Sequence, residues 1–251
     1  MLRDGKTMKS VEYLENLTLI IKRIMTEQIG NIELAAKAVA LTLENGGRVH
    51  AFGTGHSHML AEELFYRAGG LVNINPILET SLMLHESASK STALERLEGY
   101  AEILFDLHSI KEGDLLFLFS NSGRNGVAID FALLAKERGV KTVVITNMEH
   151  TMKGASRHSS GKKLYEAGDI VIDNCGCYGD ASVKFDNFTT RAAPTSTSAG
   201  AAILNAIEAR SIEIMLADGF EPEVFSSSNV DGGDEINERY IEKYKREIRS
   251  L

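Results

Sequence analysis

Short apolar segments alternate with helical segments along the middle of the chain, and this alternation limits the fold more than any other feature. Residues 115–119 (LLFLF) and 141–146 (KTVVIT) stand on either side of a helical segment, 125–139. Strands that are apolar throughout are buried on both faces, as in a parallel sheet covered by helices. Further strands are expected at 48–53, 71–78 and 169–174. The sequence therefore predicts an α/β fold with a parallel sheet between helical layers.

This pattern also sets the expected boundaries. We predict a single domain with its core at residues 45–218, preceded by a helical pair at 8–44 and followed by a helical tail at 219–251. Residues 93–108 are expected to form one helix, and 179–198, rich in Asp, Thr and Ser, to be a loop.

The charge and the cysteines exclude several classes of protein. A formal charge of −8 without any basic run argues against binding to nucleic acid or to an anionic membrane surface. Cys175 and Cys177 form a C-x-C pair with no further partner, which indicates reduced thiols and a cytoplasmic location. The first ten residues lack the apolar segment of a signal peptide, and no apolar run approaches the length of about 20 residues that a membrane helix needs.

Three strand-to-helix junctions combine small hydroxyl or amide side chains with the start of a helix: FGTGHSH, FSNSGRNG and APTSTSAG. Ligands of doubly wound sheets bind at the carboxyl ends of the strands, and helix N-termini favour anions. The candidate phosphate-binding residues are Ser57, Ser120, Asn121, Ser122, Asn125, Thr195, Ser196 and Thr197. The same residue types are ordinary helix caps, so plain capping stays open at each junction. Neither nucleotide-binding glycine motif is present.

The sequences GTGHS at 53–57 and SNSGRN at 120–125, together with 136–146 and APTSTSAG, resemble the sugar isomerase (SIS) domain family over most of residues 33–217. The resemblance implies a three-layer αβα sandwich with a five-stranded parallel, flavodoxin-like sheet. It also implies a sugar-phosphate ligand and a homodimer or homotetramer with sites between subunits. Many members have Thr where Asn125 stands here, although Asn still offers a donor.

Isomerisation between an aldose and a ketose needs a base beside the sugar carbons and a donor at the oxygens. The candidates are Glu62 and Glu63 on the helix after GTGHSH, and His85 with Glu86 in the loop after the second strand. Adjacent helical residues diverge by about 100°, so at most one of the two first glutamates lines the cleft. We expect Glu208, on the last long helix, to be structural.

Metal and cofactor sites are not predicted. His56 and His58 flank Ser57, and Glu62 follows His58 by four residues. Phosphoheptose isomerases, which belong to the family that the chain resembles, hold zinc in this region. Fewer than three ligands are secure from the sequence, so we expect no metal and no cofactor. The catalytic candidates therefore remain Glu62, His85 and Glu86.

Three functions stay open. An aldose–ketose isomerase leads, a lyase, etherase or deaminase acting on a phosphorylated amino sugar is the second enzyme class, and a non-catalytic sugar-phosphate sensor is the third. Residues 1–45 carry no basic recognition helix, which argues against a DNA-binding regulator.

Overall fold

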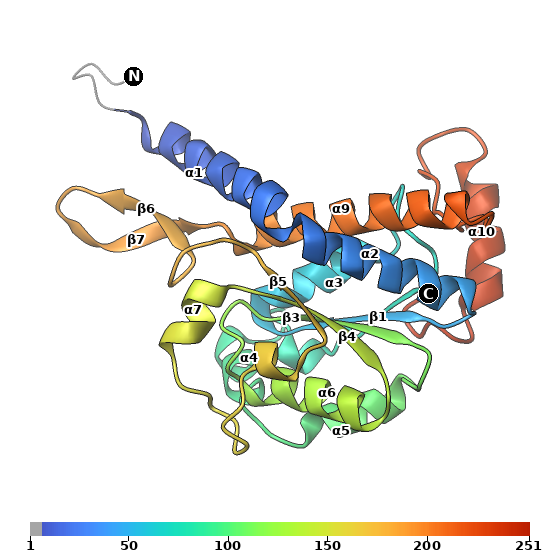
Figure 1. The fold of residues 1–251 in the computed structure, drawn as a ribbon, viewed down its shortest axis with the longest axis horizontal. Coiled ribbons are helices and arrows are strands. Elements are labelled where there is room, and N and C mark those ends of the chain that lie inside the picture. The colour runs from blue at the N-terminus through green and yellow to red at the C-terminus, as the bar shows by residue number, and fades with distance from the viewer. Residues whose placement is uncertain (1–6) are drawn as a thin grey trace.

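Five parallel strands form the central sheet: β1 (Val49–Gly53), β2 (Ile74–Pro76), β3 (Leu115–Phe119), β4 (Lys141–Thr146) and β5 (Ile170–Asp173). Their order in the sheet is β2-β1-β3-β4-β5 in the computed structural model, which describes residues 7–251. Helices flank this sheet (Figure 1). The expected three-layer αβα fold with a five-stranded parallel sheet is confirmed. The expectation about a signal peptide concerns residues 1–10, of which 1–6 lie outside the described residues.

Helices cover both faces of the sheet because side chains of each strand alternate between two apolar cores. Leu115, Phe117 and Phe119 pack against α2 (Ile29–Glu44), α3 (His58–Leu64) and α9 (Ser196–Ala217). Leu116 and Leu118 face the opposite way, against α5 (Tyr100–Leu107), α6 (Gly126–Glu137) and α8 (Leu164–Ala167). All five β3 side chains are buried, which is why the segment is apolar throughout.

The N-terminal helices are continuous rather than paired through a turn. α1 (Lys9–Arg23) passes into α2 through a π-helical stretch, η1 (Ile24–Gln28). Ile20 is the one buried residue of α1, and this helix projects away from the body of the molecule (Figure 1). Among the described residues, no helix combines the length and the apolar character that crossing a membrane requires.

Two expectations about secondary structure are wrong. Residues 179–198 include a hairpin, β6 (Ala181–Phe185) with β7 (Phe188–Pro194), whose turn has Asn187 at a φ of 59°, a conformation that Asn tolerates well. The predicted single helix at 93–108 is divided into α4 (Ala88–Leu94) and α5, because Gly99 takes a left-handed φ of 84° between them.

The remaining elements lie in the connections and the tail. They are two 3₁₀ turns, η2 (Gly55–Ser57) and η3 (Thr80–Leu82), together with α7 (Met148–Lys153) and α10 (Gly233–Tyr244). α10 lies within residues 219–251, where the sequence predicts a helical tail.

Candidate functional site

A small cavity lies at the carboxyl edge of the sheet, where the three hydroxyl-rich junctions meet. Its volume is about 20 Å³, roughly the space of one water molecule. It is lined by Ser57, Leu60, Ser120, Asn121, Ile145, Asn174, Ser196 and Thr197. Five of the eight predicted phosphate-binding residues therefore share one cavity, while Ser122, Asn125 and Thr195 do not line it.

The turn after β3 is rigid. The Ser120 hydroxyl accepts a hydrogen bond from the Gly123 N–H at 3.1 Å, and Thr146 Oγ1 donates to the Ser120 carbonyl at 2.7 Å. Gly123 has a φ of +58°, and a Cβ there would lie 2.8 Å from Thr151 Oγ1. The turn thus needs glycine, and the Ser120 hydroxyl already has a structural partner.

The hydroxyl groups of Ser57 and Ser122 differ from that of Ser120. Neither makes a side-chain hydrogen bond within the part of the chain that the structure describes, and both residues are only partly buried. Ser57 stands at the N-cap position of α3, but its hydroxyl makes no capping hydrogen bond there. Ser122 does not stand at the N-cap position of a helix. These two hydroxyls remain available to a ligand.

Amides that follow β4 and β5 extend the site, and sequence reasoning missed them. Asn174 Nδ2 donates to Asn121 Oδ1 at 2.8 Å, and Asn147 Nδ2 donates to Asn174 Oδ1 at 2.8 Å. Because Asn121 Oδ1 is occupied, its Nδ2 group is the end that can donate to a ligand. An amide directly after an apolar strand was the signal that would have identified both residues.

The N-terminus of α9 already holds a carboxylate. Asp180 Oδ1 accepts from the N–H groups of Thr195 at 3.0 Å and Ser196 at 2.8 Å, and Asp180 Oδ2 accepts from the Ser196 hydroxyl at 2.6 Å. At this junction the capping interpretation fits the contacts, although the cap comes from Asp180 rather than from the hydroxyl residues themselves. A negative charge so close to Ser196 also disfavours a second anion there.

The N-terminus of α6 is different, because no side chain caps it. Asn125 stands at the N-cap position, but its Oδ1 accepts a hydrogen bond from Arg157 Nη1 at 3.0 Å. Arginine can only donate, so the oxygen of this amide must face Arg157 and the Nδ2 group must point elsewhere. α6 has 12 residues, long enough for its dipole to favour an anion at this end.

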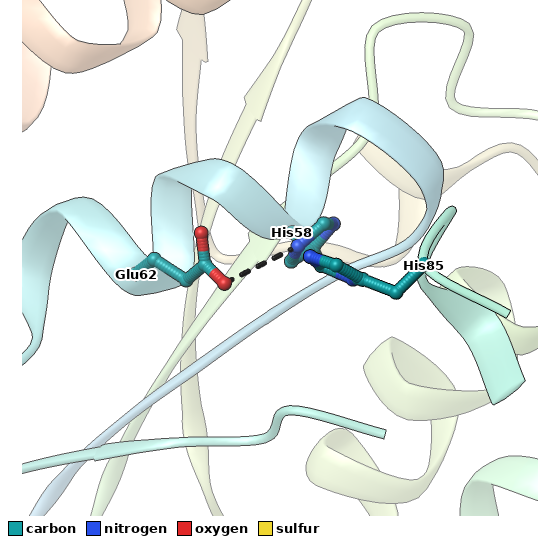
Figure 2. Close-up of side chains that lie close together, drawn as sticks. All are labelled: His58, Glu62 and His85. Carbon is teal, nitrogen blue, oxygen red and sulfur yellow. Dashed lines mark ion pairs between the residues drawn. The ribbon is translucent and has the colours of Figure 1, made fainter. Parts of the chain in front are cut away.

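Three possible metal ligands come together beside the junction after β1: His58, Glu62 and His85 (Figure 2). Each offers one ligand atom, and these atoms lie within 4.8 Å of one another. His58 Nε2 is 3.4 Å from Glu62 Oε1, and the two imidazole rings meet edge to face with centroids 5.4 Å apart. The sequence suggested His58 and Glu62 as a pair and did not foresee His85 as the third member.

The hydrogen bonding of His58 suits a metal ion. His58 Nδ1 bonds the Gly55 carbonyl oxygen, which can only accept, so this nitrogen carries a proton. His58 Nε2 is buried and has no hydrogen-bond partner in residues 7–251. A backbone carbonyl that fixes the tautomer, with the other nitrogen turned to a carboxylate, is the usual arrangement around a metal-binding histidine.

The other glutamates have structural partners. Glu63 forms an ion pair with Arg67 and accepts from Asn205, so only Glu62 faces the histidines, as expected for adjacent helical residues. Glu208 is buried and accepts from the Leu71 N–H at 2.5 Å, and burial raises its pKa.

The carboxylate of Glu86 is turned toward Lys90, with which it forms an ion pair on the surface. The hydrogen bond from Lys90 lowers the pKa of Glu86. A general base for sugar chemistry is favoured by a raised pKa, so the lowered pKa of Glu86 disfavours it in this role.

Comparison with known proteins gives a consistent family. The family model described as SIS domain matches residues 12–147. A UPF0309 protein of Geobacillus thermodenitrificans is 46% identical over 240 residues, which cover 96% of each chain. A UPF0309 protein of Listeria monocytogenes is 45% identical over 239 residues, covering 95% of this chain and 97% of the relative.

Solved structures with a similar fold include a phosphoheptose isomerase from Neisseria gonorrhoeae. Its TM-score is 0.52 at 15% sequence identity, with 82% of this chain and 96% of that chain covered. A phosphoheptose isomerase from Francisella tularensis has a TM-score of 0.51 at 19% identity, with 82% and 97% covered. At these identities the similarity concerns the fold.

Proposed function

Because the chain belongs to the SIS domain family and its full-length relatives are UPF0309 proteins, we propose that it binds a sugar phosphate and interconverts its aldose and ketose forms. The observation that carries this proposal is the cavity at the carboxyl edge of the sheet, shared by Ser57, Ser120 and Ser196. Capping does not account for Ser57, whose side chain lines this cavity without making a capping hydrogen bond.

The phosphate is proposed to lie at the mouth of the cavity, against the start of α6. The cavity itself holds about one water molecule, and Asp180 occupies the start of α9. At the start of α6 the Val127 N–H already donates to the Glu95 carbonyl oxygen at 3.2 Å, which leaves the N–H groups of Gly126 and Ala128. The free hydroxyls of Ser57 and Ser122 and the Nδ2 groups of Asn121 and Asn125 are further donors. Together they suit the three terminal oxygens of a phosphate monoester.

The sugar is proposed to extend from that phosphate toward His58, Glu62 and His85. Isomerisation needs removal of a proton from the carbon next to the carbonyl and its return to the neighbouring carbon. Glu62 is the carboxylate that faces both histidines, with 47% of its side chain exposed and therefore reachable by substrate. We propose Glu62 as the base and His85 as the donor at the sugar oxygens, with Glu86 as the less favoured candidate base.

A divalent ion, of which zinc is the best match to two histidines and a carboxylate, is the alternative use of the same three residues. When bound, it would polarise the sugar carbonyl as a Lewis acid. In that case His58, Glu62 and His85 hold the ion through His58 Nε2, a carboxylate oxygen and one ring nitrogen of His85. The Gly55 carbonyl would keep the His58 ring oriented.

Self-association with a second copy of this chain is proposed as well. α1 buries only Ile20, whereas Leu14 and Leu19 on the same helix are 60% and 59% exposed. The β6–β7 hairpin projects beside α1 and exposes Phe188 (Figure 1). A lone two-stranded hairpin is only marginally stable in water. A dimer or tetramer burying this arm would stabilise it, which light scattering on the purified chain tests directly.

The two free thiols, Cys175 and Cys177, fit a reducing compartment. We therefore propose a cytoplasmic location.

The experiment that tests the function is a thermal-shift screen of the full chain against a panel of sugar monophosphates. A ligand found in this way is then incubated with the protein in deuterated water. Exchange of the hydrogen next to the carbonyl indicates an isomerase, release of a fragment indicates a lyase, and binding without either indicates a sensor. Ser122→Ala is expected to weaken binding about tenfold, by loss of one hydrogen bond to a charged group. Binding to none of the panel would reject the proposal.

A further inference from the structure

Three arginines surround the start of α6, and we call Arg96, Arg124 and Arg157 the arginine cluster. Arg124 belongs to the turn after β3, and its carbonyl oxygen accepts from the Arg157 N–H at 2.9 Å. The backbone of Arg96 lies against the first residue of α6, since a Cβ on Gly126 would be 2.8 Å from the Arg96 carbonyl oxygen. Three separate segments therefore meet at the start of α6, and Arg157 Nη1 reaches its N-cap residue, Asn125, at 3.0 Å.

A hydrogen-bond network fixes the segments that carry Arg96 and Arg157. Asp130 on α6 accepts from the Gly99 N–H at 2.7 Å and from His158 Nε2 at 2.7 Å. Ser159 donates to Glu98, the residue before Gly99, through its N–H at 2.7 Å. The two arginine-bearing segments are thus tied both to α6 and to one another.

Within residues 7–251 the arginine cluster has no protein counter-ion. Five described arginines each have a carboxylate at ion-pair distance: Arg23, Arg48, Arg67, Arg138 and Arg210. Four arginines outside the cluster also form no ion pair there, but they do not lie together at the start of one helix: Arg191, Arg239, Arg246 and Arg249. No carboxylate of residues 7–251 stands at ion-pair distance from the three members of the cluster. The nearby Glu95 instead accepts from Thr54 Oγ1 at 2.8 Å. Burial and the charges of Arg124 and Arg96 lower the pKa of Arg157.

Arg124 is held in a prepared place. Its Nε atom is buried and has no hydrogen-bond partner among the described residues. Its guanidinium lies against Gly154, where an added Cβ would be 3.2 Å from Nη1. Gly154 has a φ of −101°, which any residue adopts, so the backbone does not require glycine there. Space for the Arg124 side chain is the remaining reason for a glycine at this position.

Asn125 separates the arginine cluster from the phosphate. Its Oδ1 accepts from Arg157, which leaves Nδ2 as the only donor that Asn125 can offer to the cradle of Ser57 and Ser122. The oxygen and nitrogen of an amide point in diverging directions, so the groups that they contact lie on different sides of Asn125. Arg157 therefore faces a region next to the phosphate rather than the phosphate itself.

We propose that the arginine cluster binds a second anionic group, a carboxylate or a phosphate, carried by the same ligand. This inference rests on the proposed function, because it assumes a first phosphate at Ser57 and Ser122. Glu95, Glu98 and Asp130 lie in the surrounding network and offset part of the charge, but none of them forms an ion pair with the arginine cluster. The guanidiniums therefore have room for an anionic partner, and they bind carboxylate and phosphate with paired hydrogen bonds.

The test compares three ligands by calorimetry at fixed ionic strength: a hexose monophosphate, a hexose bisphosphate and a phosphorylated aldonic acid. The full-length wild-type chain is expected to bind at least one of the two doubly anionic ligands about tenfold or more tightly than the monophosphate. The preferred ligand identifies the second group as phosphate or carboxylate. Arg124→Gln and Arg96→Gln are each expected to remove this gain while changing monophosphate affinity less than about twofold.

Arg138→Gln is the matched control, because it removes the same charge from the opposite end of α6. It is expected to keep the preference for the doubly anionic ligand. Arg96 is exposed, so its variant tests the inference even if Arg124→Gln does not fold.

Two results overturn the inference alone: equal affinity for all three ligands, or equal losses of monophosphate and doubly anionic ligand in the arginine variants. Failure of all three ligands to bind wild-type protein would instead overturn the proposed function together with this inference.

Discussion

Replacing Asp180 with asparagine tests whether the start of α9 is a helix cap or an anion site. Asp180 accepts three hydrogen bonds, two from N–H groups at 3.0 and 2.8 Å and one from a hydroxyl at 2.6 Å. Asn keeps the shape, tolerates the φ of 69° found at this position and retains one acceptor oxygen, but it removes the charge. Hydrogen bonds to a charged acceptor contribute about 1 kcal/mol more than neutral ones, and the helix dipole adds a fraction of a kcal/mol. We expect Asp180→Asn to lower the free energy of unfolding by about 2 kcal/mol.

Urea unfolding followed by circular dichroism measures this loss, which corresponds to a midpoint lower by roughly 0.7–1 M for a slope of 2–3 kcal/mol/M. The same variant should bind a sugar phosphate more tightly, by roughly two- to tenfold, because a negative charge beside the cavity is gone. Asp218→Asn, at the C-terminal end of the same helix, is the control and should not lose stability. An unchanged unfolding midpoint, or weaker ligand binding by the Asp180 variant, would show that the carboxylate does not act as a cap beside an anion site.

Three further predictions follow from the histidines and glutamates. His58→Ala should reduce zinc affinity at least 100-fold, as measured by competition with a chromophoric chelator; wild-type protein that binds no zinc would leave the cluster as an acid–base set. In an active preparation, Glu62→Gln should lower turnover at least about 100-fold while ligand affinity is retained. Glu86→Gln should change turnover less than about threefold, because the Glu86 carboxylate is paired with Lys90. A larger loss of turnover in Glu86→Gln than in Glu62→Gln would assign the role of base to Glu86. Burial lowers the pKa of His108 to about 4, whereas a histidine in the unfolded chain has a pKa near 6.5. As the pH falls, the unfolded state therefore takes up the proton first. The free energy of unfolding should decrease by on the order of 1–3 kcal/mol between about pH 6.5 and pH 4. His108→Gln should flatten that part of the stability profile, and an equally steep profile in the variant would contradict this cause.

The neutral state of His108 follows from its contacts as well as from its burial. Asn75 Nδ2 donates to His50 Nδ1 at 2.9 Å and to His108 Nδ1 at 3.2 Å, so both ring nitrogens must be unprotonated acceptors. Burial also lowers the pKa of His50, whose other nitrogen pairs with Asp114 at 3.1 Å. Protonation of either Nδ1 would therefore break a hydrogen bond inside the protein.

The sheet could be predicted from the sequence because its determinant is local. The strands of the parallel sheet are buried on both faces or nearly so. A strand buried in this way consists of consecutive apolar residues, as 115–119 does. The junctions after β1 and β3 were also predictable, since chain direction alone puts the carboxyl ends of parallel strands at one edge. The hydroxyl-rich segment after β7 was recognised from its residue types alone, because β7 belongs to the separate antiparallel hairpin and not to the parallel sheet.

The contents of that edge were less predictable, because they depend on contacts between distant segments. Asp180 reaches the start of α9 from 15 and 16 residues earlier in the chain, across the hairpin that the sequence analysis took for a loop. His85 joins His58 only because the loop after η3 folds back to the start of α3. Arg96 owes its position to the break at Gly99, which was predicted to be helical. In each case the contact joins residues that are distant in the sequence, so the local residue pattern does not predict it.

Buried polar atoms without partners support the proposal that this edge binds a ligand. Seven buried side-chain atoms lack a hydrogen-bond partner in residues 7–251, and five of them belong to the carboxyl side of the sheet: His58 Nε2, Arg124 Nε, His150 Nδ1, Thr151 Oγ1 and Thr195 Oγ1. Each such atom costs the folded state about 1–3 kcal/mol of lost hydration. A folded chain retains that cost most readily where a ligand supplies the missing partners. A bound ligand should then raise the free energy of unfolding by more than its hydrogen bonds to the exposed hydroxyls alone would give. We expect the additional stabilisation to come from its contacts with His58 and Arg124, at the two ends of the proposed substrate.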